Sequence, residues 1–232
     1  MKKTIVIHQP DFLPYLGFFH RLIHADTFVI FDNAQYVNGT SHSWMNRDKL
    51  KTSQGEKWLT VSVKKAARET LINQIVLSEN AEWRKSNLNL VHHNYKQSPY
   101  FEEIYPYIET LYAYEGNLLY EFNLHSIRML MTLLDVEVFE VFSSSLDTFG
   151  KKNELLVDIL QKVGATHYLS GVGAKAYFDP ELYEKAGIEV VWQDFVHPVY
   201  PQLHGPFIPY LSSIDALFNC GIEETRKILR SS

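Results

Sequence analysis

The sequence has little cysteine, no long apolar run and no surplus of positive charge, and each absence excludes a class of protein. Its single cysteine, Cys220, cannot form an internal disulfide, so we expect a protein of the reducing cytoplasm rather than a disulfide-stapled secreted scaffold. The apolar run near the start is too short for a signal peptide, and no stretch approaches the ~20 apolar residues of a transmembrane helix, so no membrane partner is expected. Lys plus Arg number 22 against 27 Asp plus Glu, a net charge of −5. Nucleic acid is therefore not an expected partner, because binding its phosphates needs surplus cations.

Several motifs that would identify a chemistry are also missing. The sequence has neither a His-Glu-x-x-His motif nor a cysteine pair, so no metal site is predicted. It has no Gly-x-Ser-x-Gly elbow. The glycines of 170–175 match neither the phosphate-loop spacing nor the complete Gly-x-Gly-x-x-Gly fingerprint.

What is present is a composition typical of a packed domain. Hydrophobic residues make up 46% of the 232 residues and charged residues 21%, which excludes a disordered chain. Aromatic residues reach 14%, the one unusual feature. A length of this order predicts one domain over 1–232, and it leaves the oligomeric state open.

The pattern of apolar runs predicts alternating strands and helices. Short β-branched runs followed by amphipathic segments predict an α/β fold with a doubly wound, mostly parallel sheet. Expected strands are 4–8, 27–31, 58–63, 71–76, 137–142, 167–171 and 187–192. Expected helices are 14–23, 82–96, 99–114, 117–134, 151–163, 180–186, 212–219 and 223–230. The α/β core is thus predicted from 1–60 and 135–232, with a helical insertion at about 80–134.

Three residues that follow predicted strands or lie in a rigid loop are candidates for catalysis. Ligands of an open parallel sheet collect beyond the carboxyl ends of its strands, which selects His8 and Asp32. His8 is a candidate general base or phosphate contact, and the alternative is a half-buried structural histidine. Asp32 is a candidate for binding a ribose hydroxyl, a cation or an amine, and the alternative is a helix or turn cap. His197, in a proline-rich loop, is the third.

Polar, basic and aromatic residues around the same loops are candidates for substrate binding. The basic ones suit a phosphate-bearing small molecule, although for Lys64 and Lys65 a solvated hairpin turn is the favoured interpretation. Ser212 is expected first as a helix cap and second as a ligand contact. The candidates are Gln9, Tyr15, Gln35, Asn46, Arg47, Lys64, Lys65, Ser170, Gly171, Tyr200, Gln202 and Ser212.

Blocks of the sequence, taken in order, resemble the WbqC-like family over nearly the whole chain. The matching blocks include His8-Gln9-Pro10, Asn46-Arg47, Tyr168-Leu169-Ser170-Gly171, His197-Pro198-Val199-Tyr200-Pro201-Gln202 and Leu211-Ser212-Ser213-Ile214-Asp215. The resemblance implies a transferase of bacterial surface-glycan (O-antigen, lipopolysaccharide) biosynthesis that attaches an amino acid such as glycine to a nucleotide-linked amino sugar. The alternative is a non-catalytic nucleotide-sugar-binding or scaffold protein of that pathway.

A looser similarity links the start of the chain to nucleotidylyltransferase-type enzymes. In those enzymes a His-x-Gly-His motif serves ATP-dependent adenylation, and here Tyr15-Leu16-Gly17-Phe18 is the nearest match. ATP is therefore a possible cofactor by this resemblance, although both histidines are replaced.

Overall fold

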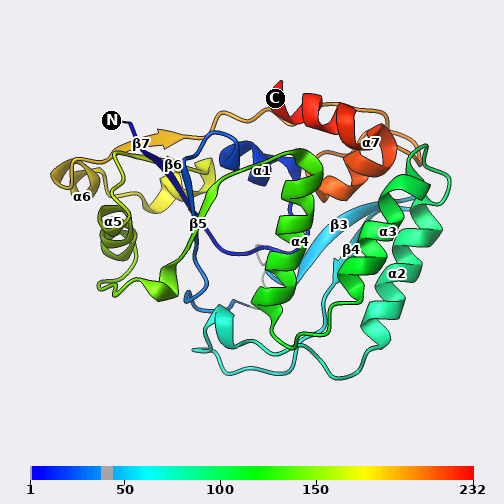
Figure 1. Ribbon diagram of the computed structural model, residues 1–232, viewed down its shortest axis with the longest axis horizontal. Helices are drawn as coiled ribbons and strands as arrows, with labels where there is room; N and C mark the ends of the chain where they lie inside the picture. Colours follow the sequence, from blue (N-terminus) through cyan, green and yellow to red (C-terminus); the bar gives the residue numbers. More distant parts are fainter. Residues whose placement is uncertain (1, 38–43) are drawn as a thin grey trace.

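The computed structural model describes residues 2–37 and 44–232, and its centre is a five-stranded sheet (Figure 1). The strand order is β5-β2-β1-β6-β7 and every pairing is parallel. The strands are β1 (Thr4–His8), β2 (Thr27–Ile30), β5 (Phe139–Phe142), β6 (His167–Ser170) and β7 (Glu189–Trp192). The chain builds outward from β1 in one direction and then in the other, so the predicted doubly wound fold is confirmed.

Alternating side chains of the sheet bury two apolar clusters, one on each face. Ile5 and Ile7 of β1 pack with α5 (Asn153–Lys162) and α6 (Pro180–Lys185). Val6 belongs to the opposite cluster, with α1 (Leu16–Leu22) and α7 (Ser213–Arg230). Figure 1 shows these helices on the two sides of the sheet. Burial on both faces explains why the strands are continuous apolar runs.

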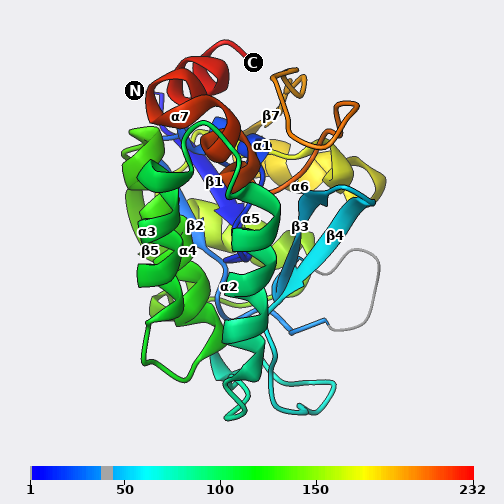
Figure 2. The ribbon, with the colours of Figure 1, turned by 90° about the vertical axis from the view of Figure 1, so that its right-hand side faces the viewer.

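The expected helical insertion is present as three packed helices (Figure 2). They are α2 (Glu82–Tyr95), α3 (Phe101–Tyr112) and α4 (Leu119–Leu134). Their apolar faces share one core with β1, α1 and α7, because Ile104, Phe122 and Leu130 join the same cluster as Val6. The insertion is therefore joined to the sheet through packing.

The region between β2 and α2 differs from the prediction. A separate antiparallel hairpin forms from β3 (Arg47–Thr52) and β4 (Gly55–Thr60), so part of the expected strand 58–63 lies outside the main sheet. The expected strand 71–76 is wrong, because Ile72–Gln74 forms a 3-10 turn, η1. Ile72 and Ile75 are buried in the core, so burial alone accounts for their apolar character without a strand.

The last helix confirms the expected break between two helical segments. Gly221 interrupts α7 with φ of 75° and ψ of 175°. The positive φ favours glycine, and a Cβ at this position would lie 2.6 Å from the ring of Tyr100, which would have to move. Two further 3-10 turns are η2 (Ser143–Ser145) and η3 (Val172–Tyr177).

Within residues 2–37 and 44–232, no helix has the length and apolar character needed to span a bilayer.

Candidate functional site

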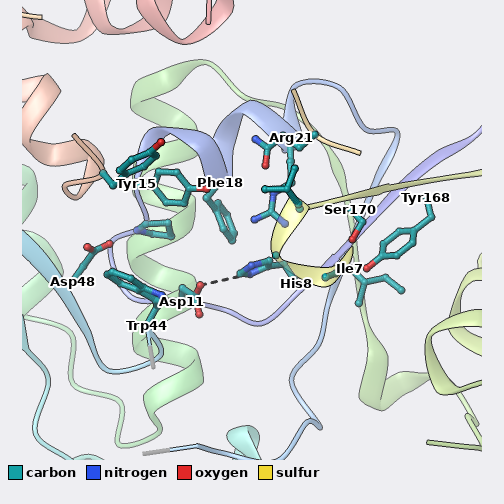
Figure 3. Close-up of a pocket in the computed structure, with 17 residues that line it drawn as sticks. Ile7, His8, Asp11, Tyr15, Phe18, Arg21, Trp44, Asp48, Tyr168 and Ser170 are labelled. Atoms are coloured by element: carbon teal, nitrogen blue, oxygen red, sulfur yellow. Dashed lines mark ion pairs between the residues drawn. The ribbon is translucent and has the colours of Figure 1, made fainter. Parts of the chain in front are cut away.

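A cavity of about 500 Å³ opens where β1 and β6 end. These two strands are neighbours, and the chain winds away from them in opposite directions, so the cavity lies at the switch point where doubly wound sheets bind ligands. Segments far apart in the sequence line it (Figure 3). The lining residues used below are His8, Asp11, Tyr15, Phe18, Arg21, Trp44, Asp48, Ser170, Gly171, Gln193 and Tyr210.

Helix α4 of the insertion holds the loop that follows β1 in place. Asn123 is fully buried, and its Nδ2 donates to the carbonyl oxygens of Pro10 (2.7 Å) and Met45 (2.5 Å). Ser126 Oγ accepts a hydrogen bond from the Leu13 amide at 3.2 Å, and Leu13 has a φ of 42°. The strained loop is thus tied to a rigid helix, which fixes two walls of the cavity.

His8, the last residue of β1, is a neutral imidazole at the floor of the cavity. Its Nδ1 lies 2.8 Å from the Gln9 carbonyl oxygen and must donate to it, since a carbonyl oxygen only accepts. Burial, with a smaller contribution from the Arg21 charge, lowers the pKa of His8 to about 3, against the opposing effect of that hydrogen bond. Nε2 is therefore an unprotonated nitrogen with no hydrogen bond to the described residues, on a ring packed edge-on against Phe18.

Asp11 lies beside His8, with its Oδ2 3.7 Å from the His8 Nδ1 (Figure 3). Burial raises the pKa of Asp11 to about 7, while the Arg21 charge opposes this rise. The pair is thus a neutral imidazole next to a carboxyl that exchanges its proton near neutral pH.

Arg21 brings the one guanidinium among the lining residues, and it has no anion to pair with. The residue is 6% exposed, and none of the described carboxylates lies within ion-pair distance of it. Its Nε is buried without a hydrogen-bond partner. Burial lowers the pKa of Arg21, yet a guanidinium keeps its charge in proteins. A desolvated cation without a partner is costly, which points to a bound anionic or polarised oxygen.

Asp48, on β3, is a second carboxyl in the cavity and is 3% exposed. Its Oδ1 accepts the Lys49 amide at 2.6 Å, and Oδ2 has no hydrogen bond to the described residues. Burial raises the pKa of Asp48 well above its usual value, and the nearby Asp11 adds to the rise.

Four of the sequence-predicted residues line this cavity, namely His8, Tyr15, Ser170 and Gly171. Gln9 lines an adjoining cavity, also of about 500 Å³, that shares His8 and Asp11 with the first. The strand-end rule selected His8, Gln9, Ser170 and Gly171, and these four line the two adjoining cavities.

Other candidates form buried structural contacts instead. Asp32 is 2% exposed and accepts hydrogen bonds from Ser143 Oγ (3.0 Å), the Ser144 amide (3.0 Å) and Asn73 Nδ2 (3.3 Å). It thereby ties β2 to η2 and does not line the cavity. Asn46 Nδ2 donates to the Val61 carbonyl at 3.2 Å.

Tyr200 and Gln202 belong to a buried network around Asp215, away from the cavity. The Tyr200 hydroxyl (3.0 Å) and Gln202 Nε2 (2.8 Å) donate to Asp215 Oδ2. The Tyr95 hydroxyl donates to Asp215 Oδ1 at 2.7 Å. The nearly buried Lys51 donates to Gln202 Oε1 at 3.0 Å, which joins the hairpin to α7.

His197 and Ser212 also hold the loop between β7 and α7. His197 Nδ1 donates to the Pro198 carbonyl at 2.9 Å, and its Nε2 is buried without a partner among the rings of Tyr200, Phe207 and Tyr210. Ser212 Oγ donates to the Leu13 carbonyl at 2.7 Å. The loop thus reaches the cavity through Tyr210, whose φ is 58°.

The basic candidates lie on other surfaces. Lys64 pairs with Glu79 at 2.5 Å, and Lys65 is exposed. Arg47 packs on the Trp58 ring, 4.2 Å from its centroid. Gln35 Nε2 donates to the Arg68 carbonyl oxygen at 2.6 Å, beside a separate surface pocket. The structure does not bring these residues to the His8 cavity.

Sequence reasoning missed Arg21 and Asp48 and gave Asp11 no role. Arg21 carries a detectable signal, because it is a charged residue on a helix whose residues are all buried. Asp48 carries no detectable signal in the sequence, because the pattern does not predict the hairpin on which it lies. Within the described part of the chain, no group of three or more His, Cys, Asp or Glu side chains could hold a metal ion.

Comparison with known proteins identifies one family and one relative that the chain resembles. The model of the WbqC-like protein family matches residues 9–227. A relative from Mycobacterium tuberculosis, named only as an uncharacterized protein, is 31% identical over 225 residues, which cover 96% of each chain. No solved structure matches the chain. The matched region includes every lining residue named above except His8, which immediately precedes it.

Proposed function

The chain belongs to the WbqC-like protein family, and we propose that it is a transferase of bacterial surface-glycan biosynthesis whose active site is the His8 cavity. The reaction is acyl transfer from an activated amino acid to the amine of a nucleotide-linked amino sugar. One observation carries this proposal. A neutral imidazole with a free Nε2 and a buried guanidinium without an anion face the same cavity.

The two groups suit the two charges that acyl transfer to an amine creates. As the amine nitrogen bonds to the acyl carbon, its proton passes to His8 Nε2, and the acyl oxygen becomes an oxyanion that the Arg21 guanidinium stabilises. When that intermediate collapses, the bond from the acyl carbon to its leaving group breaks. The leaving group takes the electron pair and then the proton from His8.

Binding of the donor would also tune the base. The Arg21 charge is one cause of the lowered pKa of His8. An anionic oxygen bound to Arg21 offsets that charge, and the pKa of His8 then rises toward the neutral range where a general base is most effective. His8 is in this way activated by the substrate. The single cysteine of the chain agrees with a cytoplasmic site for such a reaction.

The experiment is to incubate the protein with nucleotide-linked amino sugars, amino acids and ATP, and to search for products by mass spectrometry. We expect a product whose mass exceeds that of the sugar by one aminoacyl residue. His8→Gln and Arg21→Met should reduce turnover by about two orders of magnitude or more. Arg128→Met, which removes a surface guanidinium paired with Glu140, is the matched control and should not change turnover. Undiminished turnover in His8→Gln would refute the assigned role.

A second candidate function is non-catalytic binding of a nucleotide sugar within an assembly pathway. The replacement of both histidines of the His-x-Gly-His pattern by Tyr15 and Phe18 favours it, because adenylation chemistry would then lack its usual groups. The same experiment separates the two. A ligand that raises the melting temperature without any product supports binding alone.

A further inference from the structure

The His8 cavity contains buried acidic and basic groups that do not pair with each other. Arg21 is 6% exposed and Asp48 is 3% exposed, and neither forms an ion pair with any described residue. In the view of Figure 3, Arg21 lies close to His8, whereas Asp48 lies beyond Asp11, beside Tyr15 and Trp44. Unpaired buried ionisable groups oppose folding, so their presence in a cavity indicates that a ligand completes them.

The Asp48 end has the chemistry of a cation site. Asp48 Oδ2 has no hydrogen bond to the described residues and is available to a ligand. Tyr15, Trp44 and Tyr210 line the cavity with it, and aromatic faces attract cations. Asp11 adds a second carboxyl, whose effect is to raise the pKa of Asp48 further.

No described lysine or arginine forms an ion pair with Asp48, although the Lys49 charge opposes part of the rise in its pKa. Lys49, the neighbour of Asp48 on β3, pairs with Glu56 at 2.6 Å and lies over the Trp58 ring. Arg21 is the one basic lysine or arginine side chain among the lining residues. A hydroxyl ligand would satisfy Asp48 Oδ2 as well, but it would not offset the two carboxyls or use the aromatic faces.

We propose that Asp48, walled by Tyr15, Trp44 and Tyr210, is an ammonium subsite, and that the cavity therefore binds a bipolar small molecule. Its protonated amine lies on Asp48 and its carboxylate or acyl oxygen lies on Arg21. This inference rests on the proposed function and refines it, because it requires an acyl donor with a free, unblocked amine. Because the described lining residues include one lysine or arginine side chain, the diphosphate of a nucleotide-linked acceptor is expected to lie outside the cavity.

The test compares aminocarboxylates with their des-amino analogues by isothermal titration calorimetry. The probes are glycine, β-alanine and 4-aminobutyrate, paired with acetate, propionate and butyrate. We expect at least one aminocarboxylate to bind about tenfold or more tightly than its analogue, as a charge-assisted hydrogen bond predicts. Asp48→Asn should reduce that preference to less than about twofold while acetate binds as in the wild type, which also shows that the cavity is intact.

Proton release is a second measurement of the same subsite. Burial raises the pKa of Asp48, and an ammonium bound to its carboxyl lowers that pKa again, so binding favours release of a proton from Asp48. The groups facing Asp48 are Asp11 from the loop after β1, Tyr15 from the start of α1, Tyr210 from the loop before α7, and Lys49 on its own strand. Binding enthalpies of the aminocarboxylate should therefore depend more strongly on the ionisation enthalpy of the buffer in the wild type than in Asp48→Asn, where Asp11 still titrates near neutral pH.

Equal affinity for each aminocarboxylate and its analogue, or a preference that Asp48→Asn retains, would overturn the subsite. Trp44→Leu gives an independent check, since it should weaken aminocarboxylate binding and leave acetate binding unchanged. His8→Gln separates this inference from the proposed function. Ammonium preference without turnover supports the subsite alone, whereas equal turnover with amino and des-amino donors supports the transferase and refutes the subsite.

Discussion

Replacing Arg21 by methionine should make the protein more stable and less able to bind its ligand. Methionine keeps an unbranched side chain of similar length against the Phe18 ring, where the guanidinium carbon lies 5.9 Å from the centroid. It removes a charge that is buried without an ion pair and an Nε without a hydrogen-bond partner. The change is therefore a direct test of whether Arg21 serves the ligand or the fold.

The magnitude follows from these two deficits. A buried donor without a partner costs about 1–3 kcal/mol, and replacing buried ionic groups by apolar side chains of similar volume is neutral or stabilising by up to about 4 kcal/mol. The lost stem contacts offset part of this gain. We expect the free energy of unfolding to rise by about 1–3 kcal/mol, which for a protein of this size raises the melting temperature by roughly 2–12 °C.

Urea denaturation followed by circular dichroism measures the free energy, and titration with acetate measures binding. The matched control is Arg84→Met, because Arg84 Nη1 donates to the Tyr112 carbonyl at 2.8 Å and the guanidinium lies over Trp83. That variant should be less stable by about 1–2 kcal/mol, since the carbonyl loses its donor. If Arg21→Met is instead destabilised to the same extent as the control, or still binds acetate with wild-type affinity, the guanidinium has a structural role and the assignment fails.

Three further predictions test individual carboxyls and the imidazole. Folding lowers the pKa of His8 from 6.5 to about 3, so between these values the unfolded chain binds a proton at His8 that the folded protein does not. Folding raises the pKa of Asp11 from 3.8 to about 7, so in that range the folded protein binds a proton at Asp11 that the unfolded chain does not. As the pH rises from about 4 to 7, the free energy of unfolding of His8→Gln should fall relative to that of the wild type, and that of Asp11→Asn should rise relative to it. Urea titrations measure these free energies, and equal slopes against pH in all three proteins would contradict the linkage. Asp215→Ala leaves three donors without their acceptor and should cost about 3 kcal/mol or more by urea denaturation, and a loss below about 1 kcal/mol would show that the network contributes little. Asp32→Asn should cost about 1–3 kcal/mol and leave acetate binding unchanged by calorimetry, whereas a binding defect at full stability would restore Asp32 to the site.

The alternation of elements and part of the site were accessible from the sequence because both follow from local rules. A strand buried on both faces must be a continuous apolar run, as 4–8 and 27–31 are. Parallel strands end at the same edge, so the polar residues that follow them are brought together, and His8 and Ser170 do line one cavity.

The same rule did not place Asp32 in the cavity, although it too follows a strand. Its carboxyl lies toward η2, where two serines supply donors, and the sequence carries no sign of that pairing. The segment 71–76 shows a second limit. Its apolar residues are buried by contact with α4 and not by a strand, and periodicity over six residues does not distinguish these.

The class of fold, the family and the imidazole at the end of β1 were predictable from the sequence, because burial pattern and motif order are properties of neighbouring residues. Which buried ionisable groups lack a partner depends instead on how distant segments pack. Arg21 on α1 and Asp48 on β3 are 27 residues apart in number, and whether each meets a partner depends on how the hairpin and the helix pack. An unpaired buried charge is a property of the folded interior, where desolvation makes the absence of a partner matter.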